Sequence, residues 1–238
     1  MEMFPDGAHV RLLSRVRDMP TRTGWNVSLT ARRHYLNTVW LVHRLMRDGK
    51  HYVLFHSAAY GGYLGLSCSE NQTWDLFQGM YTSPTQEDIL WQAVKVHNGK
   101  GVILLRHVEY SSYLLDLTRG EDGNAGRRWA IEAVPATRHA PPLRRRTHLV
   151  PGIIRRQVTL IKMDYHGNLV TDTAQKFEFK GRSTYDLRAV LANKLNKIPS
   201  NLTLCLFVGS EGRLTPLMGD LPNREDTVVI AVLETGSL

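Results

Sequence analysis

The sequence predicts two domains joined by a short basic linker, with an all-β domain at residues 1–134 and a smaller α+β domain at residues 157–238. Three observations lead to this organisation. In the first part, a pattern of apolar and aromatic residues recurs roughly every 40 to 50 positions. Residues 157–238 instead follow the order strand, strand, helix, strand, strand. Between the two lies a segment, 135–156, that is rich in proline and arginine and has no acidic residue.

The first domain contains an internal repeat. Residues 52–66 align with residues 102–116, so that the matched leucines and tyrosines are 50 positions apart. Each repeat predicts two short strands around a tight turn, for which Gly61-Gly62 is a hairpin signal. Another repeat opens near His9, and each of the three ends in a strand that carries a tryptophan: Trp40, Trp91 and Trp129. Three unequal repeats of about four strands each predict a β-trefoil, and aromatic residues at equivalent positions are expected to fill its shared core.

One long segment separates the second repeat from the third. Residues 68–87 include Trp74 in a polar setting, Asn-Gln-Thr-Trp-Asp at 71–75. This composition predicts an irregular loop with an exposed aromatic side chain, and loops of this kind often form contact surfaces. Trp74 is therefore a candidate partner-binding residue. The alternative is a loop that packs on itself.

Residues 135–156 hold most of the net charge, contributing +6 of the chain's +8. Four prolines exclude a continuous helix or a central strand, so we expect a semi-extended linker. Its arginines would attract an acidic surface, such as a filament, RNA or an anionic membrane, or act as a nuclear localisation signal. The alternative is a solvated spacer, and the absence of Phe, Tyr and Trp argues against nucleic-acid binding by base stacking. The candidate partner-binding residues of the linker are Arg144, Arg145, Arg146, Arg155 and Arg156.

A helix is predicted in the middle of the second domain. Ser183 is its expected N-cap, with Asp186 three positions later in the manner of a capping box. Pro199 is expected to stop it. The predicted apolar stripe of this helix consists of Leu187, Val190, Leu191, Leu195 and Ile198.

The strands of the second domain are predicted on both sides of that helix. Residues 157–164 and 176–180 precede it, and the latter alternates between charged residues and phenylalanine. Residues 202–208 alternate as a half-buried strand, whereas 228–233 are apolar on both faces, as is typical of a central strand. This order of elements is that of a β-grasp fold.

Several motifs resemble the plant domain-of-unknown-function 569 family. In the first domain they are FPDGAHVRL at 4–12, LNTVW at 36–40 and YVL at 52–54, and in the second FEFKGRS at 177–183 and GRLTPL at 212–217. The resemblance implies a fascin-like, actin-cross-linking-type β-trefoil followed by a ubiquitin-like domain. One departure lies in the first repeat, where residues 18–25, with Pro20, stand in place of the family's Gly-x-Tyr-Leu hairpin.

Motifs of catalytic chemistry are missing from the sequence. The ten histidines show no metal-ligand spacing, no Gly-x-Ser-x-Gly motif is present, and neither Cys68 nor Cys205 has a basic neighbour that would activate it. We therefore expect a protein without enzymatic activity, cofactor or metal. His51, His56 and His107 are expected to be surface residues or satisfied strand residues.

The sequence shows neither a signal-peptide pattern nor an apolar run of membrane-spanning length, so we expect no membrane insertion. The two cysteines fall in different predicted domains, which favours a reducing compartment over a disulfide-linked secreted protein. We expect a cytoplasmic protein, and the clustered arginines are compatible with a nuclear location as well.

These patterns predict a non-enzymatic protein-interaction module. Binding of actin filaments by the fascin-like trefoil, aided by the basic linker, is the first hypothesis. The alternative is a signalling or stress-response adaptor that recruits a protein partner through the ubiquitin-like domain, and the single glycine at 236 favours docking over conjugation. A carbohydrate-binding trefoil is less favoured, because the Gln-x-Trp motif of ricin-type trefoils is missing. The sequence leaves the oligomeric state open.

Overall fold

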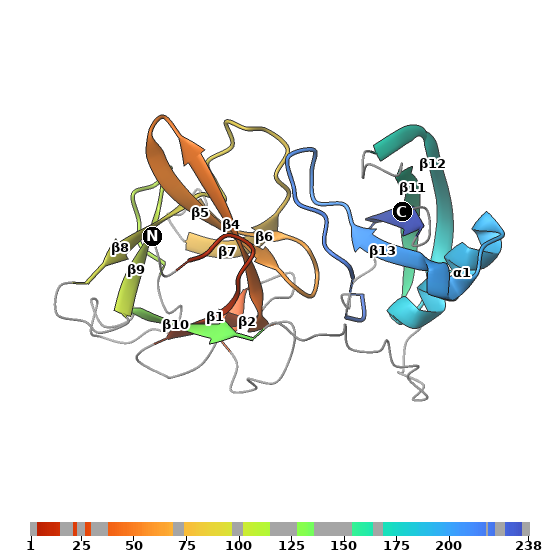
Figure 1. The fold of residues 1–238 in the computed structure, drawn as a ribbon, viewed down its shortest axis with the longest axis horizontal. Coiled ribbons are helices and arrows are strands. Elements are labelled where there is room, and N and C mark those ends of the chain that lie inside the picture. The colour runs from red at the N-terminus through yellow and green to blue at the C-terminus, as the bar shows by residue number, and fades with distance from the viewer. Residues whose placement is uncertain are drawn as a thin grey trace. The chain divides into compact units, whose positions relative to one another are not determined.

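The computed structural model divides the chain into two compact units (Figure 1). The first consists of Met1–Arg138 together with Val208–Gly212, a segment whose backbone is hydrogen-bonded to that of Tyr81. The second consists of His139–Phe207 and Arg213–Leu238. The residues that the structure describes are 4–14, 21–22, 27–29, 38–68, 74–96, 102–114, 128–135, 154–163, 169–217, 219–221 and 227–234.

Six strands of the first unit close into a barrel. Their order is β4-β1-β10-β9-β8-β5, and β5 pairs back with β4, which completes the ring. Closure leaves none of the six with a free edge. The side chains that point inward form one apolar core, which includes Phe4, Leu12 and Val53. The strands are β1 (His9–Ser14), β4 (Trp40–Arg47), β5 (Lys50–Ser57), β8 (Trp91–Lys95), β9 (Val102–His107) and β10 (Trp129–Val134).

Two hairpins lie outside this ring. The first joins β6 (Tyr63–Cys68) and β7 (Trp74–Gly79), which extend the sheet beyond β5. The second joins the short strands β2 (Thr21–Arg22) and β3 (Ser28–Leu29). A six-stranded barrel with added hairpins is a β-trefoil-like architecture, in agreement with the threefold sequence repeat.

The three repeat tryptophans occupy equivalent places in the barrel. Trp40, Trp91 and Trp129 begin β4, β8 and β10, and all three are buried. The indole N–H of Trp91 donates to the carbonyl of Leu64 at 2.8 Å, and that of Trp129 donates to the carbonyl of Leu114 at 2.9 Å. The two acceptors are 50 positions apart, as the repeat requires. The prediction that these aromatics fill the core is confirmed.

The turns after β5 and β9 repeat the same geometry. The amide of Ser57 donates to the carbonyl of Gly62 at 2.8 Å, and the amide of His107 donates to that of Ser112 at 2.6 Å. Each turn contains a residue in the left-handed region, with φ of 79° at Gly61 and 52° at Ser111. The Gly-Gly pair of one repeat is therefore replaced in the next by serines that adopt the same backbone path.

The second unit is a four-stranded sheet of order β12-β11-β14-β13 with one α-helix. The central pair, β11 and β14, is parallel, and the outer pairs are antiparallel. β14 is apolar and lies between β11 and β13, as predicted for a central strand. The elements are β11 (Arg155–Met163), β12 (Leu169–Lys180), α1 (Thr184–Leu195), the 3-10 turn η3 (Pro199–Asn201), β13 (Leu202–Leu206) and β14 (Val228–Glu234).

Helix α1 begins as predicted but ends earlier. The Ser183 hydroxyl accepts a hydrogen bond from the Asp186 amide at 3.1 Å, which is the expected N-cap. At the other end, Asn196 adopts a left-handed conformation with φ of 53° and stops the helix at Leu195. Ile198 is therefore not part of the apolar stripe, and its side chain is exposed, so this element of the prediction is wrong.

The sequence placed Arg155 and Arg156 in the linker, and the structure corrects this position. Both belong to β11, where they pair with Lys180 and Phe179 of β12. The strand alternates between exposed and buried residues, so Arg155 is exposed while Arg156 is only 2% exposed. Pairing of β11 with β12 thus extends the sheet to Arg155 and Arg156, although their charge indicated a linker. Among the described residues, no helix is long and apolar enough to cross a membrane.

Candidate functional site

Among the described residues of the first unit, the most exposed large apolar side chain belongs to the β4–β5 hairpin, whose ribbon is drawn in Figure 1. Strands β4 and β5 pair along their whole length to a two-residue turn, Asp48-Gly49. Both turn residues have positive φ, 51° and 70°, as tight hairpin turns of this kind require. Near this turn the side chain of Met46 is 69% exposed and lies opposite the exposed His51, while the exposed Lys50 pairs with Arg47. We call residues 46–51 the hairpin tip.

A loop at residues 80–90 contacts the β4–β5 hairpin through Arg47. The Gln86 side chain organises it by donating to the Met80 carbonyl and to the Asp88 carboxylate, both at 2.7 Å. The same amide group accepts from the Thr82 backbone N–H at 2.9 Å. This loop contains the end of the predicted 68–87 segment, which is less irregular than the sequence indicated. The earlier part of the 68–87 segment includes β7, which pairs with β6 along Tyr63–Cys68.

Arg47 connects the hairpin tip to this loop. Its guanidinium donates to the carbonyl of Gln86 at 3.2 Å and to that of Pro84, and it lies 3.6 Å from the Glu87 carboxylate. The positive charge of Arg47 is therefore engaged by groups of the 80–90 loop. The exposed cationic side chain at the turn is therefore Lys50, next to the exposed ring of His51.

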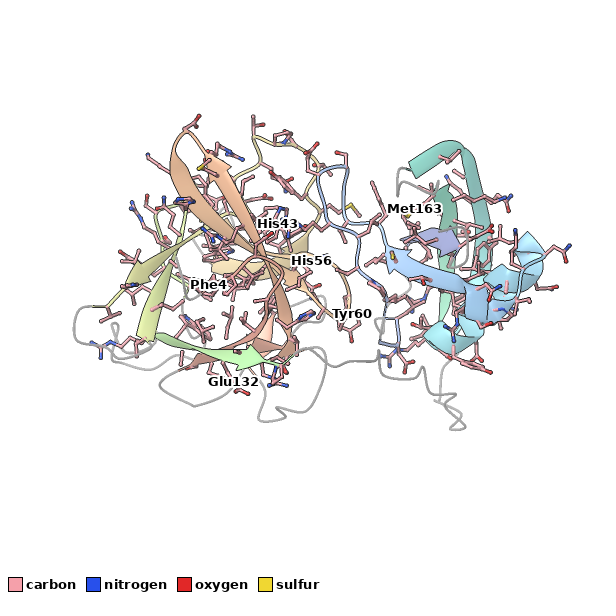
Figure 2. The ribbon with its side chains drawn as sticks, in the orientation of Figure 1. Phe4, His43, His56, Tyr60, Glu132 and Met163 are labelled. Atoms are coloured by element: carbon pink, nitrogen blue, oxygen red, sulfur yellow. The ribbon has the colours of Figure 1, made fainter. Side chains whose placement is uncertain are left out.

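A buried cluster of polar aromatic rings lies under the base of the hairpin. His43 of β4 and His56 of β5, which are labelled in Figure 2, both contact Tyr63 of β6. The Nδ1 atom of His43 is 3.1 Å from the Tyr63 hydroxyl, while the His56 ring stacks on Tyr63 with centroids 4.7 Å apart. Tyr81 adds an edge-on contact with Tyr63 at 5.9 Å. The cluster fixes β4 and β5 against β6 and against the start of the 80–90 loop.

His107 performs in the third repeat the role that Ser57 performs in the second. Ser57 accepts a hydrogen bond from the Tyr60 amide through its hydroxyl, and His107 accepts from the Tyr110 amide through Nδ1. The other ring nitrogen, Nε2, donates to the Asp88 carbonyl at 2.9 Å. These two hydrogen bonds require the neutral imidazole ring, in which Nδ1 accepts and Nε2 donates. Burial lowers the pKa of His107 from its ordinary 6.5, although the Asp88 carbonyl and nearby acidic side chains oppose the shift.

The structure places three of the six predicted partner-binding residues on described strands. Arg144, Arg145 and Arg146 lie outside the described residues. Arg155 is exposed at the start of β11, Arg156 is buried, and Trp74 begins β7, although its side chain lies outside the description.

The hairpin tip was missed by the sequence reasoning. The Asp-Gly pair at 48–49 between two apolar runs is a strong hairpin signal and could have located the turn. The exposure of Met46 follows from the length of the hairpin beyond the barrel, and no residue pattern indicates it.

Metal-ligating side chains and thiols are distributed as follows in the described stretches of the chain. No group of three metal-ligating side chains occurs among them. Burial raises the pKa of the Cys205 thiol to about 11, so this group stays protonated at neutral pH. Cys68 is exposed.

Comparison with known family models gives one match, in the second part of the chain. Residues 154–233 match the family model of the DUF569 associated ubiquitin-like domain. Comparison with curated proteins finds no match in sequence.

Several solved structures resemble the first part of the chain. The BEL β-trefoil shows 16% identity and a TM-score of 0.46, covering 55% of this chain and 95% of that one. ThreeFoil, a designed protein with threefold symmetry, shows 18% identity and a TM-score of 0.42, covering 53% and 98%. The SDF2-like protein from Arabidopsis thaliana shows 11% identity and a TM-score of 0.41, covering 56% and 88%. Likeness at this level gives no information on function. Residues 154–233 thus match the DUF569 associated ubiquitin-like domain, and a β-trefoil-like unit precedes them.

Proposed function

We propose that this protein is a non-enzymatic protein-interaction module whose trefoil unit binds an acidic protein surface through the hairpin tip, residues 46–51. The observation that carries the proposal is the 69% exposure of Met46, which lies opposite His51 in the β4–β5 hairpin, near the two-residue turn that Lys50 follows. Methionine is a flexible, polarisable side chain that adapts to a partner surface. A rigid scaffold that displays such a residue next to a cation is typical of a recognition surface.

Actin filaments are the partner that we favour, with the trefoil classified as fascin-like. The filament surface is acidic, and the tip offers Lys50 and His51 to it. The arginines of the 135–156 segment, Arg144 to Arg146 among them, would add long-range attraction. Because exposed charges more than about 8–10 Å apart are largely screened near physiological salt, this contribution should fade as salt rises.

High-speed co-sedimentation with actin filaments at low salt and near physiological salt tests the proposal. We expect the protein to pellet with filaments at low salt. Lys50→Glu and Met46→Ala should each weaken binding, whereas Met80→Ala, which removes another exposed methionine, should not. Replacing Arg144, Arg145 and Arg146 with serine should weaken binding at low salt and flatten the salt dependence. An absence of pelleting at low salt would exclude actin.

A second candidate function rests on the family match of residues 154–233. We infer a β-grasp fold there from the order of β11, β12, α1, β13 and β14, and ubiquitin-like β-grasp domains serve as docking modules. In this case the chain is a cytoplasmic or nuclear adaptor. Proximity labelling with the full-length chain would identify its neighbours, and enrichment of signalling proteins without actin would favour the adaptor.

A further inference from the structure

Strand β12 is an edge strand whose ladder with β11 is regular over Gln175–Lys180 and shifts register between Gln175 and Val170. It spans Leu169–Lys180, 12 residues, and it lies at the end of the four-stranded sheet. Within the described part of the chain it pairs only with β11. Edge strands are usually kept short, because their free N–H and C=O groups invite pairing with another chain. The regular stretch Gln175–Lys180 presents such groups along its outer side, so its side chains decide whether a second chain can pair there.

The hydrogen bond after the strand shows which backbone groups point outward. The Gly181 amide donates to the Ile154 carbonyl of the neighbouring chain segment at 2.8 Å. In an antiparallel pair, successive residues direct their backbone groups to opposite sides. Phe177 and Phe179, with the parity of Gly181, therefore face β11, and Lys176, Glu178 and Lys180 direct their N–H and C=O groups away from the sheet.

The side chains of these three outward-pairing residues alternate in charge. Lys176, Glu178 and Lys180 are all exposed, whereas Phe179 is buried and Phe177 packs against the core. The sequence Lys-Phe-Glu-Phe-Lys reads the same in both directions. The contact between Lys180 and Glu178 along the strand is 3.9 Å long and half-exposed, so it holds Glu178 only weakly.

This alternation fits a second copy of the same strand. When Phe177 lies opposite Phe177 of a second chain in an antiparallel pair, Lys176 lies opposite Glu178 of that chain, and symmetry repeats the pair. In this register the whole stretch 174–180 is paired, and all its outward N–H and C=O groups find partners. Charged residues on an edge also act as guards against pairing. An edge with lysines alone would repel a second copy of the strand. Glu178, between the two lysines, instead lets the strand form opposite-charge pairs with a second copy.

We propose that the chain forms a symmetric dimer through β12, with the two edges paired antiparallel about Phe177. The two four-stranded sheets then form one continuous sheet. The proposal does not depend on the proposed function, although a dimer would carry two trefoil units, which the cross-linking of filaments requires.

Sedimentation equilibrium of the full-length protein in reducing buffer measures the association, and the reducing agent prevents linkage through the exposed Cys68. We expect a reversible dimer that weakens as salt rises, because its charge pairs are exposed. Glu178→Lys puts like charges opposite each other twice and should raise the dissociation constant about ten- to a hundredfold. Asp75→Lys, the same change of charge at an exposed site of the first unit, should leave it unchanged.

Charge exchange then tests the register. Lys176→Glu combined with Glu178→Lys restores the opposite-charge pairs and should restore the dimer. Glu178→Lys combined with Lys180→Glu leaves lysine opposite lysine and should not. Circular dichroism melts show whether each variant is folded, and the exposure of all three side chains predicts that it is. A wild-type protein that stays monomeric at its highest soluble concentration, a dimer unaffected by Glu178→Lys, or rescue by the Lys180 exchange alone would overturn the proposal.

Discussion

The indole hydrogen bonds of the barrel allow a quantitative test of its internal repeat. Trp91→Phe removes the donor to the Leu64 carbonyl, and Trp129→Phe removes the equivalent donor to the Leu114 carbonyl. Leaving a buried carbonyl without its partner costs about 1–3 kcal/mol. The smaller ring also buries less apolar surface, equivalent to about two methylene groups at ~0.8 kcal/mol each. Each variant should therefore lower the free energy of unfolding of the first unit by about 3–5 kcal/mol.

Denaturant titration followed by far-ultraviolet circular dichroism gives these free energies, with the first unit identified as the transition that both variants shift. Tyr185→Phe is the control, because this exposed aromatic lies on α1 of the second unit and should leave that transition unchanged. The reasoning requires the two tryptophan variants to agree within about 1 kcal/mol, given the usual scatter of core substitutions. A loss in one and none in the other would show that the two positions are not equivalent.

Three further predictions concern a histidine, a turn and the linker. Burial lowers the pKa of His107 in the folded chain below its ordinary 6.5. The contribution of this group to the free energy of unfolding is therefore complete above pH 6.5 and is lost as the pH falls through the folded pKa. His107→Ser, which copies Ser57, should flatten the decline in denaturant titrations between neutral and mildly acidic pH; an unchanged slope would contradict this role. Ser111→Gly should raise the unfolding free energy by about 0.5–1 kcal/mol, because φ at Ser111 is 52°; a lower melting temperature would mean that the hydrogen bond from Arg106 to the serine hydroxyl matters more. Brief trypsin treatment should cut first at residues 144–146 and leave two resistant fragments, and scattered early cleavage would count against a linker there.

The parts of the fold that follow from local rules could be predicted from the sequence. The tryptophan repeat located three strands of the barrel, because the same residue type at equivalent positions fills the same core. The Ser183 cap and the apolar run at 228–233 likewise located the start of α1 and the central strand. Ile198 shows where such rules fail, since the helix ends when Asn196 takes a left-handed conformation, and periodicity alone does not reveal this.

The candidate site was harder to predict because it depends on tertiary context. Arg156 has the charge of a linker residue, but pairing with β12 draws it into a strand and buries it. Met46 has the composition of a core residue, but the hairpin carries it beyond the barrel. In both cases the backbone pairing decides the exposure of the side chain, and the residue type alone indicates the opposite.

The way in which the barrel closes also sets the order in which it can form during synthesis. Strand β1 shares only the pairs His9–Leu41 and Val10–Trp40 with β4, whereas all six of its residues pair with β10, from His9–Val134 to Ser14–Trp129. The full pairing of β1 therefore requires β10, the last strand described in this unit, which is synthesised more than a hundred residues later. Contacts between such distant segments slow folding and leave an apolar edge open in the meantime. The pairing of β4 with β5, by contrast, needs no distant segment, because a two-residue turn joins the two strands.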